Sequence, residues 1–262
     1  MTATASPIEQ AGRQAPPAVR EAAESAVREA HKETLPTGVA IARGRAASAT
    51  AVAGLAGFIG IFAIVRARRS EAFDLALMLK LQRRSNPLLE RLMAAVSWFG
   101  FPPQSRILPP AMIAAMWAFR FPVEALFQLL AWSTGAVSTV LKAIMRRPRP
   151  VAGNDLRVVA APLGGSSFPS GHVITYVGTY GFLAYLAHTL IRPRPLRRTV
   201  VGALLGLLAL VGPSRIHQGH HWPTDVTASY LLGTSYLIVL TGLYRRAKER
   251  RRSARHDRAA RT

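Results

Sequence analysis

The stretch of residues 46–65 reads AASATAVAGLAGFIGIFAIV, and none of its 20 residues carries a charge. An α-helix of this length spans roughly 30 Å, which is the thickness of the hydrocarbon core of a bilayer. Arg66, Arg68 and Arg69 follow directly, and basic residues at the end of an apolar run are typical of a membrane interface. The stretch therefore predicts a first transmembrane helix.

Apolar segments recur along the rest of the chain and predict further spans. They cover residues 87–119, 122–141, 173–191, 199–212 and 226–244. Prolines at 102, 103, 109 and 110 interrupt the first of these, so we expect one bent or short span there. Residues 71–84 mix apolar and charged side chains and are expected to lie along the membrane surface. The fold class predicted is all-α, a polytopic membrane helix bundle of about six transmembrane helices.

The composition agrees with a membrane protein and excludes other classes. The 262 residues include 34 Lys and Arg against 13 Asp and Glu, for a formal net charge of +21, yet half are hydrophobic and only 18% are charged. Disorder is excluded as the overall description, because a disordered basic chain would be poor in Leu, Val and Phe. The chain has no cysteine, which excludes disulfides, thiolate metal sites and a cysteine nucleophile.

The positions of the basic residues predict the domain organisation and the topology. We expect a mobile cytoplasmic tail at 1–45, a membrane domain at 46–244 and a basic cytoplasmic tail at 245–262. With six spans both termini share a side, and that side, with its tails and links, carries 20 of the 34 basic residues. Cytoplasmic loops are enriched in Lys and Arg, so we expect a plasma-membrane protein with both termini in the cytoplasm.

The basic residues bracket apolar runs, so we expect lipid headgroups as their partners and no nucleic acid. RNA binding is the weaker alternative for the tail at 245–262. Glu124 lies four residues from Arg120, and an interfacial ion pair between them is expected, without a catalytic role. Arg146, Arg147 and Arg157 are interpreted as headgroup contacts.

Three polar clusters lie at the ends of predicted spans, where ionisable side chains are costly and need a functional reason. They are the segments KAIMRRPRP at 142–150, PSGH at 169–172 and SRIHQGHHWPTD at 214–225. With six spans, all three clusters fall on the face opposite the termini. The sequence therefore predicts one site at the extracytoplasmic rim.

The side chains of these clusters favour a phosphate group as the ligand. Lys142, Arg149 and Arg215 supply positive charge, and the fork of an arginine matches phosphate oxygens. Ser170 and Gly171 precede a predicted helix, whose first backbone N–H groups can bind an anion. His172 and His221 can supply a nucleophile or base and an acid, and Asp225 can orient one imidazole. This combination predicts phosphoryl transfer without a metal.

The three clusters resemble the signature of the phosphatidic-acid phosphatase type 2 superfamily, Lys-x6-Arg-Pro, Pro-Ser-Gly-His and Ser-Arg-x5-His-x3-Asp. Every fixed position is matched, and the resemblance covers roughly residues 46–244. It implies a helical core shared with haloperoxidases, no cofactor, and hydrolysis through a phosphohistidine. It also implies roles for eight residues: His221 as nucleophile, Asp225 as its orienting residue, His172 as acid, and Lys142, Arg149, Ser170, Gly171 and Arg215 as phosphate ligands.

The expected substrate is a lipid phosphate or polyprenyl diphosphate, because the site lies at a membrane rim. Undecaprenyl diphosphate, phosphatidylglycerol phosphate and phosphatidic acid all fit, and the oligomeric state stays open. A vanadium-dependent haloperoxidase, a phosphotransferase with the same pocket, and a lipid or phosphate transporter are the alternatives. A metal site at His217, His220, His221 and Asp225 is a further one; Gly219, Pro223 and the neighbouring cations argue against it.

Overall fold

The computed structural model describes residue 21 and residues 37–153, 156–158 and 164–259. These residues form helices and no strand, so the all-α prediction is confirmed. The helices are α3 (Thr37–Arg66), α4 (Glu71–Gln82), α5 (Pro87–Trp98), α6 (Gln104–Ala118), α7 (Pro122–Trp132), α8 (Thr134–Met145), α9 (Gly171–Leu190), α10 (Arg194–His217) and α11 (Pro223–Ala259). Most of the predicted tail at 1–45 lies outside the described residues.

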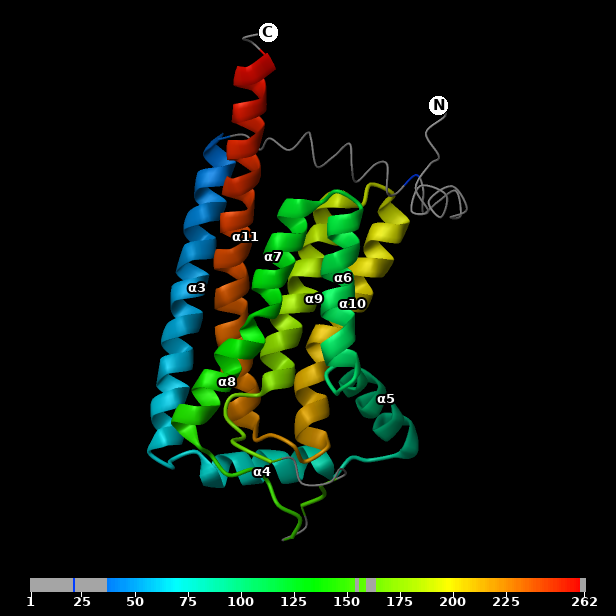
Figure 1. The fold of residues 1–262 in the computed structure, drawn as a ribbon. Coiled ribbons are helices and arrows are strands. Elements are labelled where there is room, and N and C mark those ends of the chain that lie inside the picture. Colours follow the sequence, from blue (N-terminus) through cyan, green and yellow to red (C-terminus); the bar gives the residue numbers. More distant parts are fainter. Residues whose placement is uncertain (1–20, 22–36, 154–155, 159–163, 260–262) are drawn as a thin grey trace.

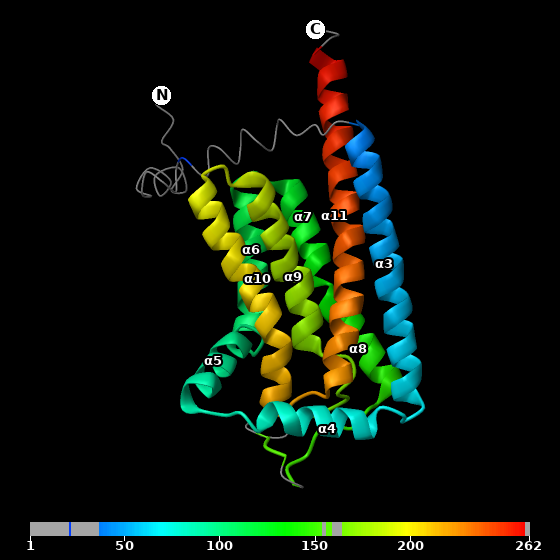
Figure 2. The same ribbon diagram turned by 180° about the vertical axis from the view of Figure 1, so that it is seen from behind.

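The bundle is built from helices that run along one axis and two that do not. Helices α3, α6, α7, α9, α10 and α11 stand roughly parallel or antiparallel, whereas α4 crosses one end of the bundle and α5 is inclined beside it (Figure 1, Figure 2). Helix α9 packs against α7, α8, α10 and α11, and α3 packs along α11. The ends of α8 and α10 and the starts of α9 and α11 therefore meet next to α4.

Small residues let the helices approach α9 closely. A Cβ added at Gly178 would overlap the carbonyl of Ala131 and the side chain of Thr134, and one added at Gly181 would overlap Leu237. Close backbone approach through small residues is a common way to pack helices in membranes, where the hydrophobic effect does not drive helices together. The two glycines thus fix α9 in the centre of the bundle.

The structure corrects the predicted span over residues 87–119. This segment forms two helices, α5 and α6, separated at Pro102 and Pro103. The later pair, Pro109 and Pro110, does not interrupt the chain and lies inside α6. The missing amide of a proline costs a helix one backbone hydrogen bond, and here α6 starts directly after the first proline pair.

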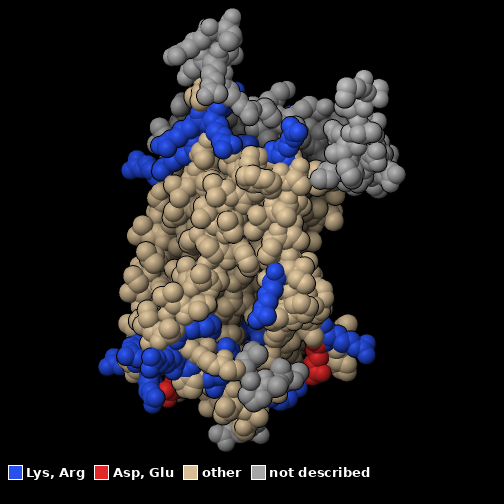
Figure 3. Space-filling view, in the orientation of Figure 1, with Lys and Arg blue, Asp and Glu red and all other residues tan. Residues whose placement is uncertain are grey.

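Among the described residues, three helices are long and apolar enough to cross a membrane: residues 44–66 of α3, α10, and residues 223–254 of α11. Lys and Arg gather mainly at the two ends of the molecule, with a wide band of other residues between them (Figure 3). Helices α7 and α8 are each too short to span alone, and together they cover the expected third span. The number of six spans remains a prediction.

Helix α4 presents polar residues to the bundle. Asp74, Met78 and Gln82 are buried and recur every four residues, so they form one stripe on the inner face of the helix. Phe73 and Leu81, in contrast, are 60% and 41% exposed. The outward apolar side chains agree with the predicted position at a membrane surface, and the inward carboxylate contributes to the site described next.

Candidate active site

His221 lies in the turn between α10 and α11 and is 2% exposed. Its Nδ1 is 2.8 Å from the carbonyl oxygen of Ser167, and its Nε2 is 3.3 Å from Nη1 of Arg149. Burial and the charges of Lys142, Arg215 and Arg149 hold the pKa of His221 well below its usual range. The neutral ring therefore donates from Nδ1 to Ser167, and the Nε2 lone pair faces the guanidinium.

Gly219 makes the turn before His221 possible. Its φ of +76° is in the left-handed region, and a Cβ there would overlap the backbone of Arg157 and Val158. The turn and the 157–158 segment consequently lie in direct contact.

Asp225 is fully buried in the first turn of α11, close to His221. Its Oδ2 accepts a hydrogen bond from the backbone amide of Trp222 at 2.9 Å and lies 3.6 Å from Nδ1 of His221. In this structure the nearer acceptor for Nδ1 is the carbonyl of Ser167. Asp225 is thus beside the ring, as expected, but a backbone carbonyl makes the direct hydrogen bond.

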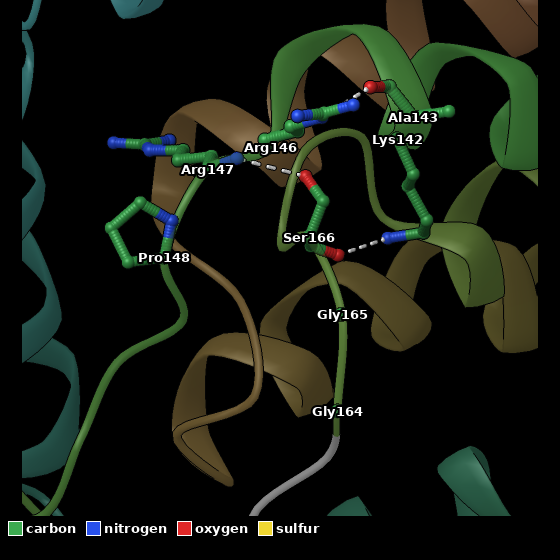
Figure 4. Close-up of a pocket in the computed structure, with 8 residues that line it drawn as sticks. All are labelled: Lys142, Ala143, Arg146, Arg147, Pro148, Gly164, Gly165 and Ser166. Atoms are coloured by element: carbon green, nitrogen blue, oxygen red, sulfur yellow. Dashed lines mark hydrogen bonds between the residues drawn. The ribbon is translucent and has the colours of Figure 1, made fainter.

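The predicted phosphate ligands from the first cluster face loop backbone. Nζ of Lys142 donates to the carbonyl of Ser166 at 2.7 Å, as the close-up shows (Figure 4). Arg149 donates to the carbonyls of His220 at 2.9 Å and Gly164 at 3.3 Å. The pKa of Arg149 is lowered, chiefly because burial disfavours its charge. Within the described ranges, neither cation has a carboxylate partner in an ion pair.

Arg215 is the largest fully buried side chain of the described chain. Its guanidinium stacks 4.9 Å from the ring centre of Phe101, and its Nη1 donates to Ser97 at 3.1 Å and to Gln218 at 3.0 Å. Its Nη2 contacts Nδ1 of His220, and its Nε has no hydrogen-bond partner. Burying a charge is costly unless it is paired, so this arginine is placed for an anion.

The second cluster, residues 169–172, lies at the start of α9 and near Arg215, because His172 and Arg215 both contact Phe101. His172 has a buried Nε2 without a partner, and its ring packs edge-on against Phe101 at 4.7 Å. The hydroxyl of Ser170 is also buried without a partner, while its amide donates to the carbonyl of Asp225 at 3.4 Å. A Cβ on Gly171 would stand 3.8 Å from Cε of Lys142, so the helix start lies next to the lysine.

A pocket of about 280 Å³ extends from His172 and Lys142 into the bundle. Its α9 side is formed by residues one turn apart, from Gly171 to Thr179, a rise of about 12 Å along the helix. Aromatic side chains, Phe99, Trp132 and Tyr180, line it together with small polar ones. A second pocket of about 550 Å³ opens on the other side of Lys142, between Arg146, Arg147 and Gly164 (Figure 4).

His220 belongs to the site although its position is variable in the sequence signature. Burial, Arg215 and Arg149 lower its pKa to about 3, and its Nε2 is buried without a partner. Its neighbour in the signature, His217, is turned towards α4, where its carbonyl accepts from Gln82 at 3.2 Å. Spacing alone could not separate these two histidines, because the turn at Gly219 decides which of them faces the cations.

Arg147 is not the headgroup contact that the sequence suggested. The Arg147 side chain is 9% exposed and forms ion pairs with Asp74 and Asp225. Arg157 donates to the carbonyl of Gln82 and lies 3.5 Å from Glu90. Asp74 was missed, because its role depends on α4 folding back beneath α11.

The expected pair of Glu124 with Arg120 is also wrong. Glu124 is 2.9 Å from Nζ of Lys248 and accepts from the hydroxyl of Tyr244 at 2.7 Å. These residues lie on α7 and α11, at the end of the bundle away from His221. Arg120 instead occupies a left-handed turn before α7, with a φ of 64°.

The part of the chain that the structure describes contains no group of three or more His, Cys, Asp and Glu side chains that could hold a metal ion. The side chains around His221 are mostly cationic or neutral, a donor set that suits an anion and not a divalent metal. The arrangement can therefore hold a tetrahedral anion beside a neutral imidazole. Such an imidazole can attack phosphorus through Nε2 while Nδ1 remains protonated.

Comparisons with known proteins agree with this chemistry. A family model described as the PAP2 superfamily matches residues 123–249, which contain all eight predicted site residues. Phosphatidylglycerophosphatase B of Bacillus subtilis is 31% identical over 172 residues, covering 62% of this chain and 78% of that protein. Undecaprenyl-diphosphatase BcrC of the same organism is 28% identical over 151 residues, covering 56% of this chain and 70% of that protein.

Two crystal structures share the fold. The transmembrane PAP2-type phosphatidylglycerolphosphate phosphatase of Bacillus subtilis superposes with a TM-score of 0.65 at 24% identity, covering 75% of this chain and 96% of that one. Aquifex aeolicus LpxE superposes with a TM-score of 0.51 at 24% identity, covering 64% of this chain and 94% of that one. The predicted helical membrane architecture with its PAP2-like core is confirmed.

Proposed function

The chain belongs to the PAP2 superfamily, and we propose that it is an integral membrane phosphatase that hydrolyses a lipid phosphate or polyprenyl diphosphate through a phosphohistidine. The observation that carries this proposal is the position of His221. Its ring is neutral, its Nδ1 is held by a carbonyl, and its Nε2 faces a cationic pocket. A phosphate bound to Lys142, Arg149 and Arg215 would place its phosphorus next to that nitrogen.

The first chemical step transfers the phosphoryl group to the protein. Nε2 of His221 bonds to phosphorus as the bond from phosphorus to the leaving oxygen breaks. The cations and the first amides of α9 stabilise the charge on the three equatorial oxygens. The bound phosphate offsets the positive field at His172, which then carries the proton that it gives to the leaving oxygen.

The second step releases phosphate. A water molecule replaces the lipid product and gives a proton to His172 as its oxygen attacks phosphorus. The bond from phosphorus to Nε2 breaks, and the imidazole returns to its neutral form. The sum is one ester or anhydride bond hydrolysed by one water, and neither step calls for a metal or an organic cofactor.

A lipid is the preferred substrate because the pocket beside His172 leads into the bundle. Its aromatic and small polar lining suits the first few bonds of a chain whose remainder stays in the bilayer. The names of both curated relatives refer to lipid substrates, a phosphatidylglycerophosphate and an undecaprenyl diphosphate. We propose the same class for this chain.

The direct test is to purify the protein in detergent and measure phosphate release from phosphatidic acid, phosphatidylglycerol phosphate and undecaprenyl diphosphate. Release that continues in chelator, is inhibited by vanadate and leaves an acid-labile phosphohistidine is the expected result. Vanadate can adopt the five-coordinate geometry of the transition state. Activity that vanishes in chelator and returns only with Mg²⁺ or Zn²⁺ would contradict the metal-free mechanism.

We further propose that the site faces the outside of the plasma membrane and that both tails are cytoplasmic. The start of α3 and the end of α11 lie at the end of the bundle opposite α4 and the clusters (Figure 2). The chain lacks cysteine, so Gly164→Cys and Thr199→Cys can be labelled without background. A membrane-impermeant thiol reagent applied to intact cells should label the first and spare the second, and the reverse pattern would invert the topology.

A further inference from the structure

Arg147 joins two buried carboxylates on different helices. Its Nη1 lies 2.5 Å from Oδ1 of Asp225 on α11, and its Nη2 lies 2.6 Å from Oδ2 of Asp74 on α4. The same two nitrogens donate to hydroxyls, Nη1 to Thr224 at 2.8 Å and Nη2 to Ser70 at 3.1 Å. Each terminal nitrogen of the guanidinium therefore donates to one carboxylate and one hydroxyl, and a lysine could not reach both carboxylates in this way.

The backbone of Arg147 holds the other acceptor of His221. Its carbonyl accepts from the amide of Ser167 at 2.9 Å, and its amide donates to the hydroxyl of Ser166 at 3.0 Å. The carbonyl of Ser167 in turn accepts from Nδ1 of His221. The two oxygens that face Nδ1 thus belong to Ser167 and Asp225, and both of these residues are hydrogen-bonded to Arg147.

Asp74 fixes the start of α11 from below. Its Oδ1 accepts from the amide of Thr224 at 2.8 Å, and its Oδ2 accepts from the hydroxyl of Thr224 at 2.8 Å. A carboxylate in this place satisfies a free amide of the first turn and interacts favourably with the helix dipole. Helix α4 lies outside the range matched by the family model. Its Asp74 nevertheless binds Thr224, the residue directly before Asp225.

The charges of this network suit a positive imidazole. Asp74, Asp225 and Arg147 together carry one net negative charge in a buried place beside Nδ1. When Nε2 bonds to phosphorus and Nδ1 keeps its proton, the imidazole of His221 becomes cationic. A fixed negative charge near Nδ1 stabilises that form, and rigid acceptors keep Nε2 aimed at phosphorus.

We propose that Arg147, braced by Asp74, is a positioning residue that holds His221 for attack. The proposal rests on the phosphatase function proposed above. Arg147 acts on His221 and not on the substrate, so its loss should lower kcat and leave KM nearly unchanged. Arg149 contacts the pocket directly, so its loss should raise KM as well.

The test compares Arg147→Gln, Arg147→Lys and Arg149→Gln with Arg84→Gln, which removes the same charge from an exposed position just after α4. Single-turnover kinetics count the competent enzyme by the amplitude of phosphohistidine formation, so misfolded protein does not enter the rate. For Arg147→Gln we expect phosphorylation to slow about 10- to 100-fold, with KM within about threefold. Arg147→Lys should recover part of the rate, and Arg84→Gln should behave as wild type.

A double variant shows whether Asp74 acts through Arg147. Asp74→Asn should add little to the loss already caused by Arg147→Gln, because residues of one network are not additive. Unchanged phosphorylation by Arg147→Gln, or a rise in KM equal to that of Arg149→Gln, would overturn the proposal.

The melting temperatures of wild type, Asp74→Asn, Arg147→Gln and the double variant keep the two proposals apart. If wild type releases no phosphate from any lipid, the proposed function fails. A non-additive thermal effect of Asp74→Asn and Arg147→Gln would still support the network, and an additive one would count against it.

Discussion

Two buried arginines, Arg147 of the first cluster and Arg215 of the third, have opposite surroundings. Arg147 is clamped between Asp74 and Asp225. Arg215 is less exposed still, yet in the described residues its neighbours are a ring, hydroxyl, amide and imidazole groups, and its Nε has no partner. Arg147 therefore has two carboxylate partners, whereas Arg215 has none among the described residues.

This difference distinguishes residues that hold the site in shape from residues that bind the anion. An arginine with carboxylate partners is part of the folded framework, because removing it leaves two unpaired buried charges. An arginine buried without a counter-ion reduces stability, and such a cost is tolerated where an anion is to be bound. Asp225 belongs to the framework and His221 to the anion pocket. The framework and the pocket therefore meet between these two residues, at the start of α11.

The largest effect is expected from His221→Ala. If the unpaired cations surround a nucleophile, this variant should fold and bind vanadate, but it should lose about 10³-fold or more of its phosphate release. Release and binding can be measured on the same detergent preparation. Substantial turnover by the variant at normal protein levels would show that the cations serve another group.

Arg215→Gln and Arg147→Gln should have opposite profiles. We expect Arg215→Gln to lower kcat/KM by roughly 10²- to 10³-fold and to abolish the rise in melting temperature that vanadate gives to wild type. Its melting temperature without vanadate should fall less than that of Arg147→Gln, which leaves two carboxylates unpaired. Thermal unfolding of both variants with and without vanadate checks this. Equal losses of stability would contradict the division into two regions.

The pH dependence of kcat/KM tests whether the neighbouring cations lower the pKa of His221. Arg149 helps to lower the pKa of His221, and attack requires the neutral ring, so activity is present above that pKa and is lost as the pH falls through it. Arg149→Gln removes one positive neighbour and should move the acidic limb of kcat/KM to higher pH. The substrate titrates identically in both assays, and Arg84→Gln should show no displacement. A limb that stays in place would mean that Arg149 does not act on the nucleophile.

The smallest effect is expected at the other end of the bundle. Glu124→Gln weakens the contacts to Lys248 and Tyr244, so it should lower the free energy of unfolding by about 1 kcal/mol and leave kcat and KM unchanged. Thermal unfolding and phosphate release measured together test this. A loss of activity without a loss of stability would show that the two ends of the bundle are coupled.

Much of the protein follows from local patterns in the chain. Apolar runs of bilayer length predict helices because a lipid environment requires every backbone group to be bonded within its own segment. The clusters from Lys142 to Asp225 predict phosphate chemistry because their residue types have few other uses at the end of a span. Local patterns failed over residues 87–119, where they predicted one span. The chain there forms two helices, α5 and α6, which are separated at Pro102 and Pro103 and run in different directions (Figure 1).

Contacts between distant segments were settled only by the tertiary structure. The partners of Arg147 lie 73 and 78 residues away, and Glu124 pairs 124 residues away instead of with its neighbour Arg120. Spacing along a helix predicts only the contacts within that helix, and a buried charge takes whichever partner the packing brings to it. The sequence determined which residues carry charge and where helices run. The packing of α4 against α10 and α11 decided which charges are paired and which stay open for an anion.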